Sequence, residues 1–183
     1  MPSRAHSLIW DGVMFVRAGV FKNGIFRFVI QLDSSFPLQK NPPIIKLLNH
    51  IVHPLVNEDT SIFDASPAFP TWSDNDHIYE ILKFLKYAIE NVEYCCTQVQ
   101  RPSNRTAVEL YHNDRQKFLE MSRDAVTKSV NEVFNSNPHD DKQHVFSFDK
   151  SIVDDGLHDQ ILENMKSLSD SSDNFSFSFE RRG

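Results

Sequence analysis

The side chains best suited to covalent chemistry are the thiols of two adjacent cysteines, Cys95 and Cys96. A thiolate can serve as a nucleophile, and two thiols together can form a redox pair. Neighbouring cysteines, however, fit neither a disulfide framework nor the spacing of zinc ligands. Both also lie far in the sequence from His53. We therefore expect small buried or half-buried side chains rather than a nucleophile or a redox centre.

Histidine is the commonest metal ligand, and the chain has eight of them. His50 and His53 are three residues apart, and His139 and His144 are five apart. The usual zinc sites add cysteine ligands or place the histidines on a helix beside a glutamate. Neither of these pairs has a cysteine partner or such a helical Glu-His context. We therefore expect no metal site and no cofactor.

The composition indicates an acidic protein with a folded core. Hydrophobic residues make up 40% of the 183 residues, and the formal net charge is −6. This length suffices for one domain of about 100–150 residues plus an extension. The absence of a Lys/Arg block argues against nucleic acid or an anionic membrane as the main partner, and no apolar run reaches the roughly 18 residues of a membrane span. Without a signal-peptide core or a disulfide framework, we expect a reducing compartment, the cytoplasm or the nucleus.

The first part of the chain predicts three antiparallel strands. Residues 8–20 are rich in apolar and β-branched residues, and Asn23-Gly24 is typical of a hairpin turn because both residues tolerate positive φ. The next strand alternates, which predicts one buried face made of Phe26, Phe28, Ile30 and Leu32. Residues 44–48 form a third strand. Residues 49–76 should be irregular, because they contain Pro54, Pro67 and Pro70.

The second part predicts helices. Asp74 or Asp76 can cap a helix of about five turns that begins near His77, with an apolar stripe of Ile78, Ile81, Leu82, Leu85, Ile89 and Val92. Residues 101–104 break it, and Ser103 or Asn104 caps a second helix with a stripe of Ala107, Leu110, Tyr111, Phe118 and Met121. A last helix runs through Ala125, Val126, Val130 and Val133 to about Phe134. Strands followed by helices indicate an α+β fold with an antiparallel meander sheet.

A change in composition after the last helix divides the chain into three parts. We expect a folded domain at 7–134, an extension with a short helix at 135–166, and a disordered Ser/Asp/Phe-rich tail at 167–183. The extension keeps apolar side chains beyond a domain that already has its own core. We predict that these side chains contact a partner: Val145, Phe146, Phe148, Ile161 and Leu162.

From about Trp10 to Phe134 the chain resembles the ubiquitin-conjugating enzymes. The resemblance is carried, in this order, by the Gly24 hairpin, Phe26-Arg27-Phe28, Phe36-Pro37 with Pro42-Pro43, His53-Pro54, Trp72, and Pro102-Ser103-Asn104 before Ala107 and Tyr111. It implies a ubiquitin-conjugating-enzyme-like fold. Conjugating enzymes have a helix before the first strand. Because only about seven residues precede Leu8, we expect that helix to be missing.

The resemblance also implies a degenerate catalytic site. In that family a His-Pro-Asn triplet is followed by the cysteine that carries ubiquitin as a thioester. Here Leu55 stands at the asparagine position of His53-Pro54-Leu55, and Phe63, eight residues on, stands at the cysteine position. A phenyl ring cannot form a thioester, and leucine cannot donate a hydrogen bond to an oxyanion. The resemblance therefore implies no catalytic residue and no enzyme activity.

Two interpretations stay open for the side chains around this site. Phe63 is either a recognition residue or a packing residue, and Leu55 is either a contact or part of the packing. The nearby carboxylates are either an acid–base pair or ordinary loop residues: Asp33, Glu58, Asp59 and Asp64. For all of them we expect the structural role.

Within that superfamily the chain looks most like the Fused Toes family, also called AKT-interacting protein, which includes crossbronx. The similar segments are Val13–Phe21, Val52–Val56, His77-Ile78 and Ala107–Tyr111, with looser similarity at Phe146–Phe148 and His158–Met165. Members of this family lack the catalytic cysteine. The resemblance implies an adaptor that joins a Hook-type coiled-coil protein and a Hook-interacting protein in a complex linking dynein to endosomal cargo. It also implies the kinase AKT as a partner.

Two other functions remain open. One is a ubiquitin-binding variant that partners an active conjugating enzyme or sorts ubiquitinated cargo. The other is a conjugating enzyme that uses Cys95 or Cys96, against which their position and the missing asparagine argue. We expect a cytoplasmic protein, peripheral on endosomes through its partners, without direct insertion into the membrane.

Overall fold

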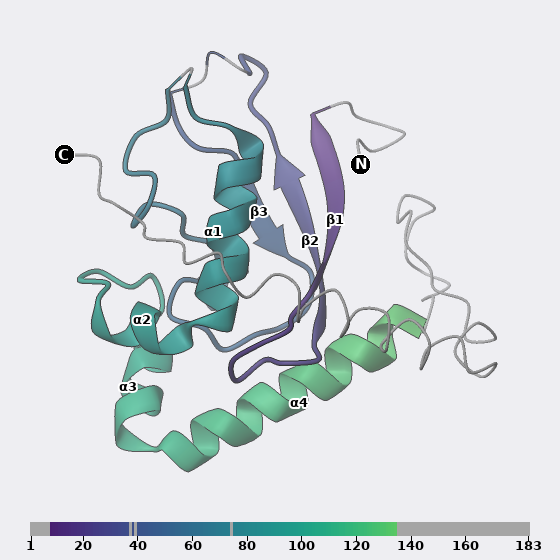
Figure 1. Cartoon of the computed structure of the whole chain (residues 1–183), viewed down its shortest axis with the longest axis vertical. Coiled ribbons are helices and arrows are strands. Elements are labelled where there is room, and N and C mark those ends of the chain that lie inside the picture. Colours follow the sequence, from purple (N-terminus) through teal and green to yellow (C-terminus); the bar gives the residue numbers. More distant parts are fainter. Residues whose placement is uncertain (1–7, 37, 39, 74, 135–183) are drawn as a thin grey trace, which may run out of the picture. The chain divides into compact units, whose positions relative to one another are not determined.

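The computed structural model describes residues 8–36, 38, 40–73 and 75–134. One antiparallel sheet has the strand order β1 (Ile9–Phe15), β2 (Ile25–Gln31), β3 (Ile44–Leu47) and β4 (Ile62–Phe63). The helices α1 (Ile78–Glu90), α2 (Val92–Thr97), α3 (Arg105–Asn113) and α4 (Arg115–Phe134) follow it in sequence (Figure 1). This order of strands and then helices confirms the predicted α+β fold.

The core lies between one face of the sheet and α1. The predicted face of β2 is buried in full, with Phe26, Phe28, Ile30 and the following Leu32 all at most 7% exposed. These side chains belong to one cluster with the buried face of α1, which includes Ile81 and Leu85. Burying this shared apolar surface fixes α1 against the sheet.

Strand β4 lies in the region predicted to be irregular, so that prediction is wrong there. Ile62 and Phe63 pair with Lys46 and Ile45 of β3, and Phe63 also forms a bridge with Val56. A strand of two residues is too short to show a period of two. Its place depends on pairing partners that only the folded chain brings together.

The connection from β1 to β2 is longer than the predicted Asn-Gly turn. The Val16 N–H donates to the Gly24 carbonyl at 3.0 Å, and Asn23 has a positive φ of 71°. Gly19 also has a positive φ, of 74°, and a Cβ atom there would collide with the backbone oxygen of Glu90. Glycine is therefore required at position 19, where this loop touches the end of α1.

The first helix begins near His77, as predicted, but its cap and its end differ from the prediction. Its N-cap is His77, whose N–H donates to the Glu80 carboxylate at 3.0 Å, while Asp76 accepts hydrogen bonds from Ser73 instead. The predicted helix of about five turns is interrupted at Asn91, which has φ −123° and ψ 59°. The Asn91 side chain donates to the Tyr87 carbonyl at 2.9 Å, so it competes with the backbone for that acceptor.

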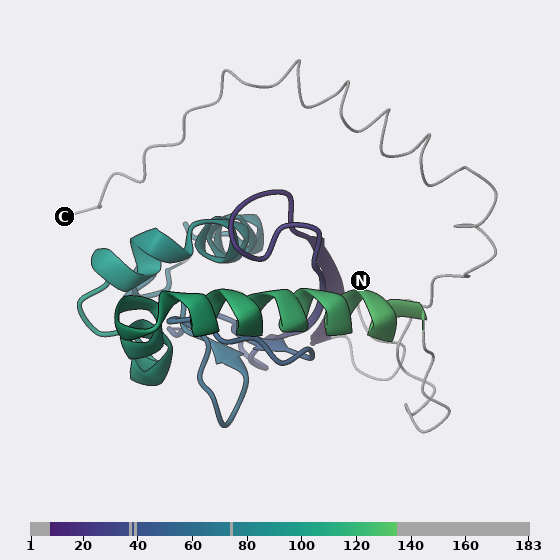
Figure 2. The ribbon, with the colours of Figure 1, turned by 90° about the horizontal axis from the view of Figure 1, so that it is seen from below.

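The next break also lies elsewhere than predicted. Asn104 caps α3 as expected, and its Oδ1 accepts from the Ala107 N–H at 2.9 Å. Asp114, however, separates α3 from α4, and its carboxylate accepts from the Lys117 N–H at 3.0 Å. Helix α4 then runs without interruption to Phe134 (Figure 2), where the sequence had predicted two helices.

Two polar contacts attach α4 to the sheet. The Ser129 hydroxyl accepts from the Ile25 N–H at 3.1 Å. The buried Asn49 accepts from the Arg27 N–H and donates to the Glu132 carboxylate, both at 2.6 Å. Because polar groups lose water when they are buried, these paired contacts specify where α4 lies.

The described residues all belong to one compact unit of the chain. The extension at 135–166, the tail at 167–183 and the segment before Leu8 lie outside the described residues. So do the five side chains predicted to contact a partner: Val145, Phe146, Phe148, Ile161 and Leu162. No helix in the described part of the chain combines the length and apolar character needed to cross a bilayer.

Candidate functional site

His53 is a structural residue of the loop before β4. Its ring is fully buried, with Nε2 3.0 Å from the Ala88 carbonyl oxygen and Nδ1 3.1 Å from the Leu55 amide nitrogen. These partners require a neutral ring that donates from Nε2 and accepts at Nδ1. Burial lowers the pKa of His53 to about 4, so the ring stays neutral at physiological pH. It positions the loop and has no free nitrogen for catalysis.

The Pro54 carbonyl attaches the same loop to the start of α3. It accepts from the Asn104 N–H at 2.9 Å and from the Ser103 hydroxyl at 3.4 Å. Asn104 is also the N-cap of α3, so one residue both begins the helix and holds the loop. The family segments around His53 and around Asn104 therefore meet in space.

Leu55 and Phe63 both pack in the core, as the packing interpretation predicts. Their exposed fractions are 0% and 3%. The Phe63 ring centroid lies 5.7 Å from that of Phe84 in α1, and the Leu55 carbonyl accepts from the Asp64 N–H at 2.7 Å. Neither side chain is placed to contact a partner at the surface.

Cys95 and Cys96 are buried, as expected, with exposed fractions of 0% and 8%. Burial raises the pKa of Cys95 to about 12 and that of Cys96 to about 11. The Cys95 Sγ lies 3.7 Å from the Ala88 carbonyl oxygen, the acceptor that His53 also uses. The fold thus brings Cys95 and His53 together although they are distant in sequence. Both donate to one carbonyl, however, so the histidine does not act as a base for the thiol.

Two of the acidic residues near the loop, Asp33 and Asp64, stabilise turns. Asp33 accepts from the hydroxyl and the N–H of Ser35, which lowers the pKa of the Asp33 carboxyl. Asp64 accepts from the Ser66 N–H at 2.9 Å, and Glu58 and Asp59 are exposed. Within the described residues, no cluster of three or more His, Cys, Asp or Glu side chains is arranged to hold a metal ion.

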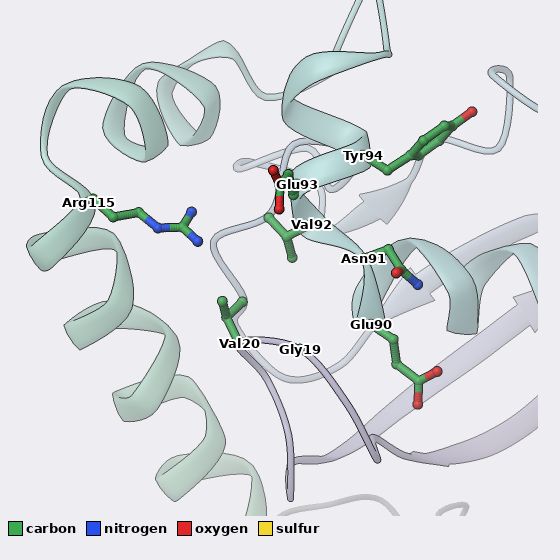
Figure 3. Close-up of a pocket in the computed structure, with 8 residues that line it drawn as sticks. All are labelled: Gly19, Val20, Glu90, Asn91, Val92, Glu93, Tyr94 and Arg115. Carbon is green, nitrogen blue, oxygen red and sulfur yellow. The ribbon is translucent and has the colours of Figure 1, made fainter. Parts of the chain in front are cut away.

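A cleft of about 480 Å³ lies at the α1–α2 junction, and we call it the Arg115 cleft. Three segments line it, and they contribute Gly19, Val20, Glu90, Asn91, Val92, Glu93, Tyr94 and Arg115. Figure 3 shows the Arg115 guanidinium directed from α4 toward Val92 and Glu93. The sequence analysis missed this cleft, since no local pattern relates three segments so far apart.

Comparison with known proteins identifies the family. A family model described as ubiquitin-conjugating enzyme matches residues 2–126. The chain belongs to the ubiquitin-conjugating-enzyme family. Protein crossbronx homolog of Culex quinquefasciatus is 32% identical, over 91% of this chain and 71% of its own length. Protein crossbronx of Drosophila mojavensis is 34% identical, over 91% of this chain and 68% of its own length. These relatives confirm the predicted crossbronx-like branch.

Solved conjugating enzymes share the fold of this family member. A putative ubiquitin conjugating enzyme from Plasmodium yoelii superimposes with a TM-score of 0.56 at 17% identity, over 69% of this chain and 78% of its own. The E2 domain of a Toxoplasma gondii ubiquitin conjugating enzyme superimposes with a TM-score of 0.55 at 16% identity. That superposition covers 68% of this chain and 82% of the Toxoplasma chain. At such identities the likeness confirms the conjugating-enzyme-like fold and carries nothing about activity.

Proposed function

We propose that this chain is a non-catalytic adaptor subunit of a Fused Toes–Hook-type complex that links dynein to vesicle and endosome transport. Phe63 carries the non-catalytic part of the proposal. By the family resemblance it stands at the thioester position, and its ring packs against Phe84 inside the core. Thioester formation needs a thiolate that the activating enzyme can reach, and a buried phenyl ring offers none.

Neither cysteine of the described region is a good replacement. With a pKa of about 12 for Cys95 and about 11 for Cys96, no more than roughly one thiol in ten thousand is ionised at neutral pH. Both side chains are also buried. A family member without a reachable thiolate keeps the fold and is limited to binding.

The adaptor part rests on the family branch. The crossbronx relatives match 91% of this chain, which includes more than the described domain. The proposed partners are a Hook-type coiled-coil protein, a Hook-interacting protein and the kinase AKT. Attachment through these partners would place the protein peripherally on endosomes.

A thioester assay tests the non-catalytic part. After incubation with activating enzyme, ubiquitin and ATP, we expect no thiol-sensitive ubiquitin band on a non-reducing gel, because no nucleophile is accessible. An active conjugating enzyme provides the positive control. A band that disappears in Cys95→Ser or Cys96→Ser would instead show that a buried cysteine is used.

A paired pull-down tests the adaptor part. The C-terminal coiled-coil fragment of a Hook-type protein should retain the full chain at micromolar concentration, and ubiquitin should not. The ubiquitin-conjugating-enzyme match favours one competing function, a ubiquitin-binding variant that partners an active conjugating enzyme. If ubiquitin retains the chain and the Hook fragment does not, the ubiquitin-binding function replaces our proposal.

A further inference from the structure

The Arg115 cleft has a rigid wall. The positive φ of Gly19 lets its loop approach the Glu90 carbonyl more closely than any side chain would permit. The Arg17 N–H then donates to the Glu90 carboxylate at 3.0 Å, which attaches the same loop to the end of α1. A site held in this way needs little ordering when a partner binds, so less binding free energy is lost.

The opposite wall presents a cation in a fixed orientation. The Arg115 guanidinium carbon lies 3.8 Å from the Tyr111 ring centroid and 5.8 Å from that of Phe118. Within the described part of the chain, no hydrogen bond or ion pair occupies this guanidinium. The contact with Tyr111 holds the group while its N–H donors can pair with a planar acceptor such as a carboxylate.

The remaining lining determines what kind of ligand suits the cleft. The half-buried Val20 provides the apolar surface between the walls, and Val92 beneath it is 3% exposed. Glu93 adds a carboxylate, and the carboxylate of Glu90 already accepts from the Arg17 N–H. A purely acidic ligand would be repelled by the glutamates, and a purely basic one by the arginine. The lining therefore suits an apolar side chain flanked by one acidic and one basic group.

We propose that the Arg115 cleft is a docking site for an amphipathic helix of a coiled-coil partner, an inference that rests on the proposed function. In a coiled-coil helix, charged residues of both signs lie beside the apolar seam, and side chains one turn apart are about 5–6 Å from each other. An apolar side chain of that helix would pack on Val20. A carboxylate of the helix would pair with Arg115, and a lysine or arginine would pair with Glu93.

The cleft is one anchor of this interface rather than the whole of it. A stable interface buries about 800 Å² on each partner, more than one such cleft provides. Arginine and tyrosine are enriched among the few residues that dominate binding energy, and Arg115 stacked on Tyr111 is such a pair. Reversing the charge of an anchor should therefore weaken binding strongly.

Charge reversal tests the docking site in the full chain. Affinity for the Hook-type C-terminal coiled-coil fragment is measured by titration calorimetry for wild type, Arg115→Glu and Glu93→Lys. Each variant should bind about tenfold more weakly or worse. Arg123→Glu is the matched control, because Arg123 is exposed on α4 outside the cleft lining, and it should bind within about twofold of wild type. Thermal melts of all four proteins confirm folding.

The outcomes separate this inference from the proposed function. Weaker binding by both cleft variants, with the control unchanged, supports the docking site. If wild type binds and both cleft variants bind within about twofold of it, the docking site is wrong. The proposed adaptor function would not be affected by that result. If wild type does not bind the Hook-type fragment, the proposed adaptor function is wrong, and this inference is wrong with it.

Discussion

Phe63 has an exposed fraction of 3%, and its ring contacts Phe84 and, through that ring, Phe69. At the position that the proposed function assigns to the family's nucleophile, this ring does more than remove one reactive atom. An aromatic side chain fills interior volume that a thiol would leave empty, and an apolar interior raises the pKa of a thiol, as it does at Cys95.

Phe63→Cys should therefore restore no activity. The new thiol would be buried and protonated, and Leu55 would still provide no oxyanion donor, so discharge of ubiquitin to lysine should stay at background. The variant should also lose about 3–4 kcal/mol of stability through the cavity it creates. Phe63→Leu, which keeps most of the volume, should lose less. If Phe63→Cys discharges ubiquitin to lysine above background, the residues around position 63 can still support catalysis.

The sequence predicted the packing role of Leu55 and Phe63 and the burial of both cysteines. It did not predict that His53 and Cys95 share the Ala88 carbonyl, because that contact joins residues separated by α1. The Arg115 cleft was missed for the same reason. Sequence patterns report local periodicity, and such sites depend on tertiary contacts.

Among the elements, β2 and α1 were predictable because each shows a clear apolar period over a sufficient length. Among the helices, the wrong predictions lie at the breaks. Val92 continues the apolar stripe of α1 beyond Asn91, so periodicity alone did not reveal the interruption there. At Asp114 the apolar stripe likewise continues into α4 with Phe118. Backbone conformation and capping, rather than hydrophobic spacing, determine both breaks.

The buried face of α1 gives a prediction at this scale. The sequence analysis placed Leu82 and Leu85 in one stripe, but Leu85 is 1% exposed while Leu82 is half-buried. Leu85→Ala should therefore lower the free energy of unfolding by about 2–5 kcal/mol. Leu82→Ala, its matched control on the same helix, should lower it by about 1 kcal/mol. Chemical denaturation measures both, and equal values would mean that the two positions are packed alike.

For the whole molecule, a domain with its own core is followed by a segment that also carries apolar side chains. The described domain already buries the stripe of α1 and the predicted face of β2. A binding role would account for the apolar residues of the extension. It also agrees with an interface that needs more area than the Arg115 cleft provides.

Two truncations test this division of roles. A chain ending before Asn135 should bind the Hook-type fragment more weakly than the full chain, because it lacks Val145, Phe146, Phe148, Ile161 and Leu162. A chain ending before Ser167 keeps those residues and should bind nearly as well as the full chain. Both should melt cooperatively, because each retains every residue of the described core. Loss of binding on removal of residues 167–183 alone would assign the contact to the last segment instead. Full binding by the shorter chain would confine the interface to the domain, where the Arg115 cleft would be its principal anchor.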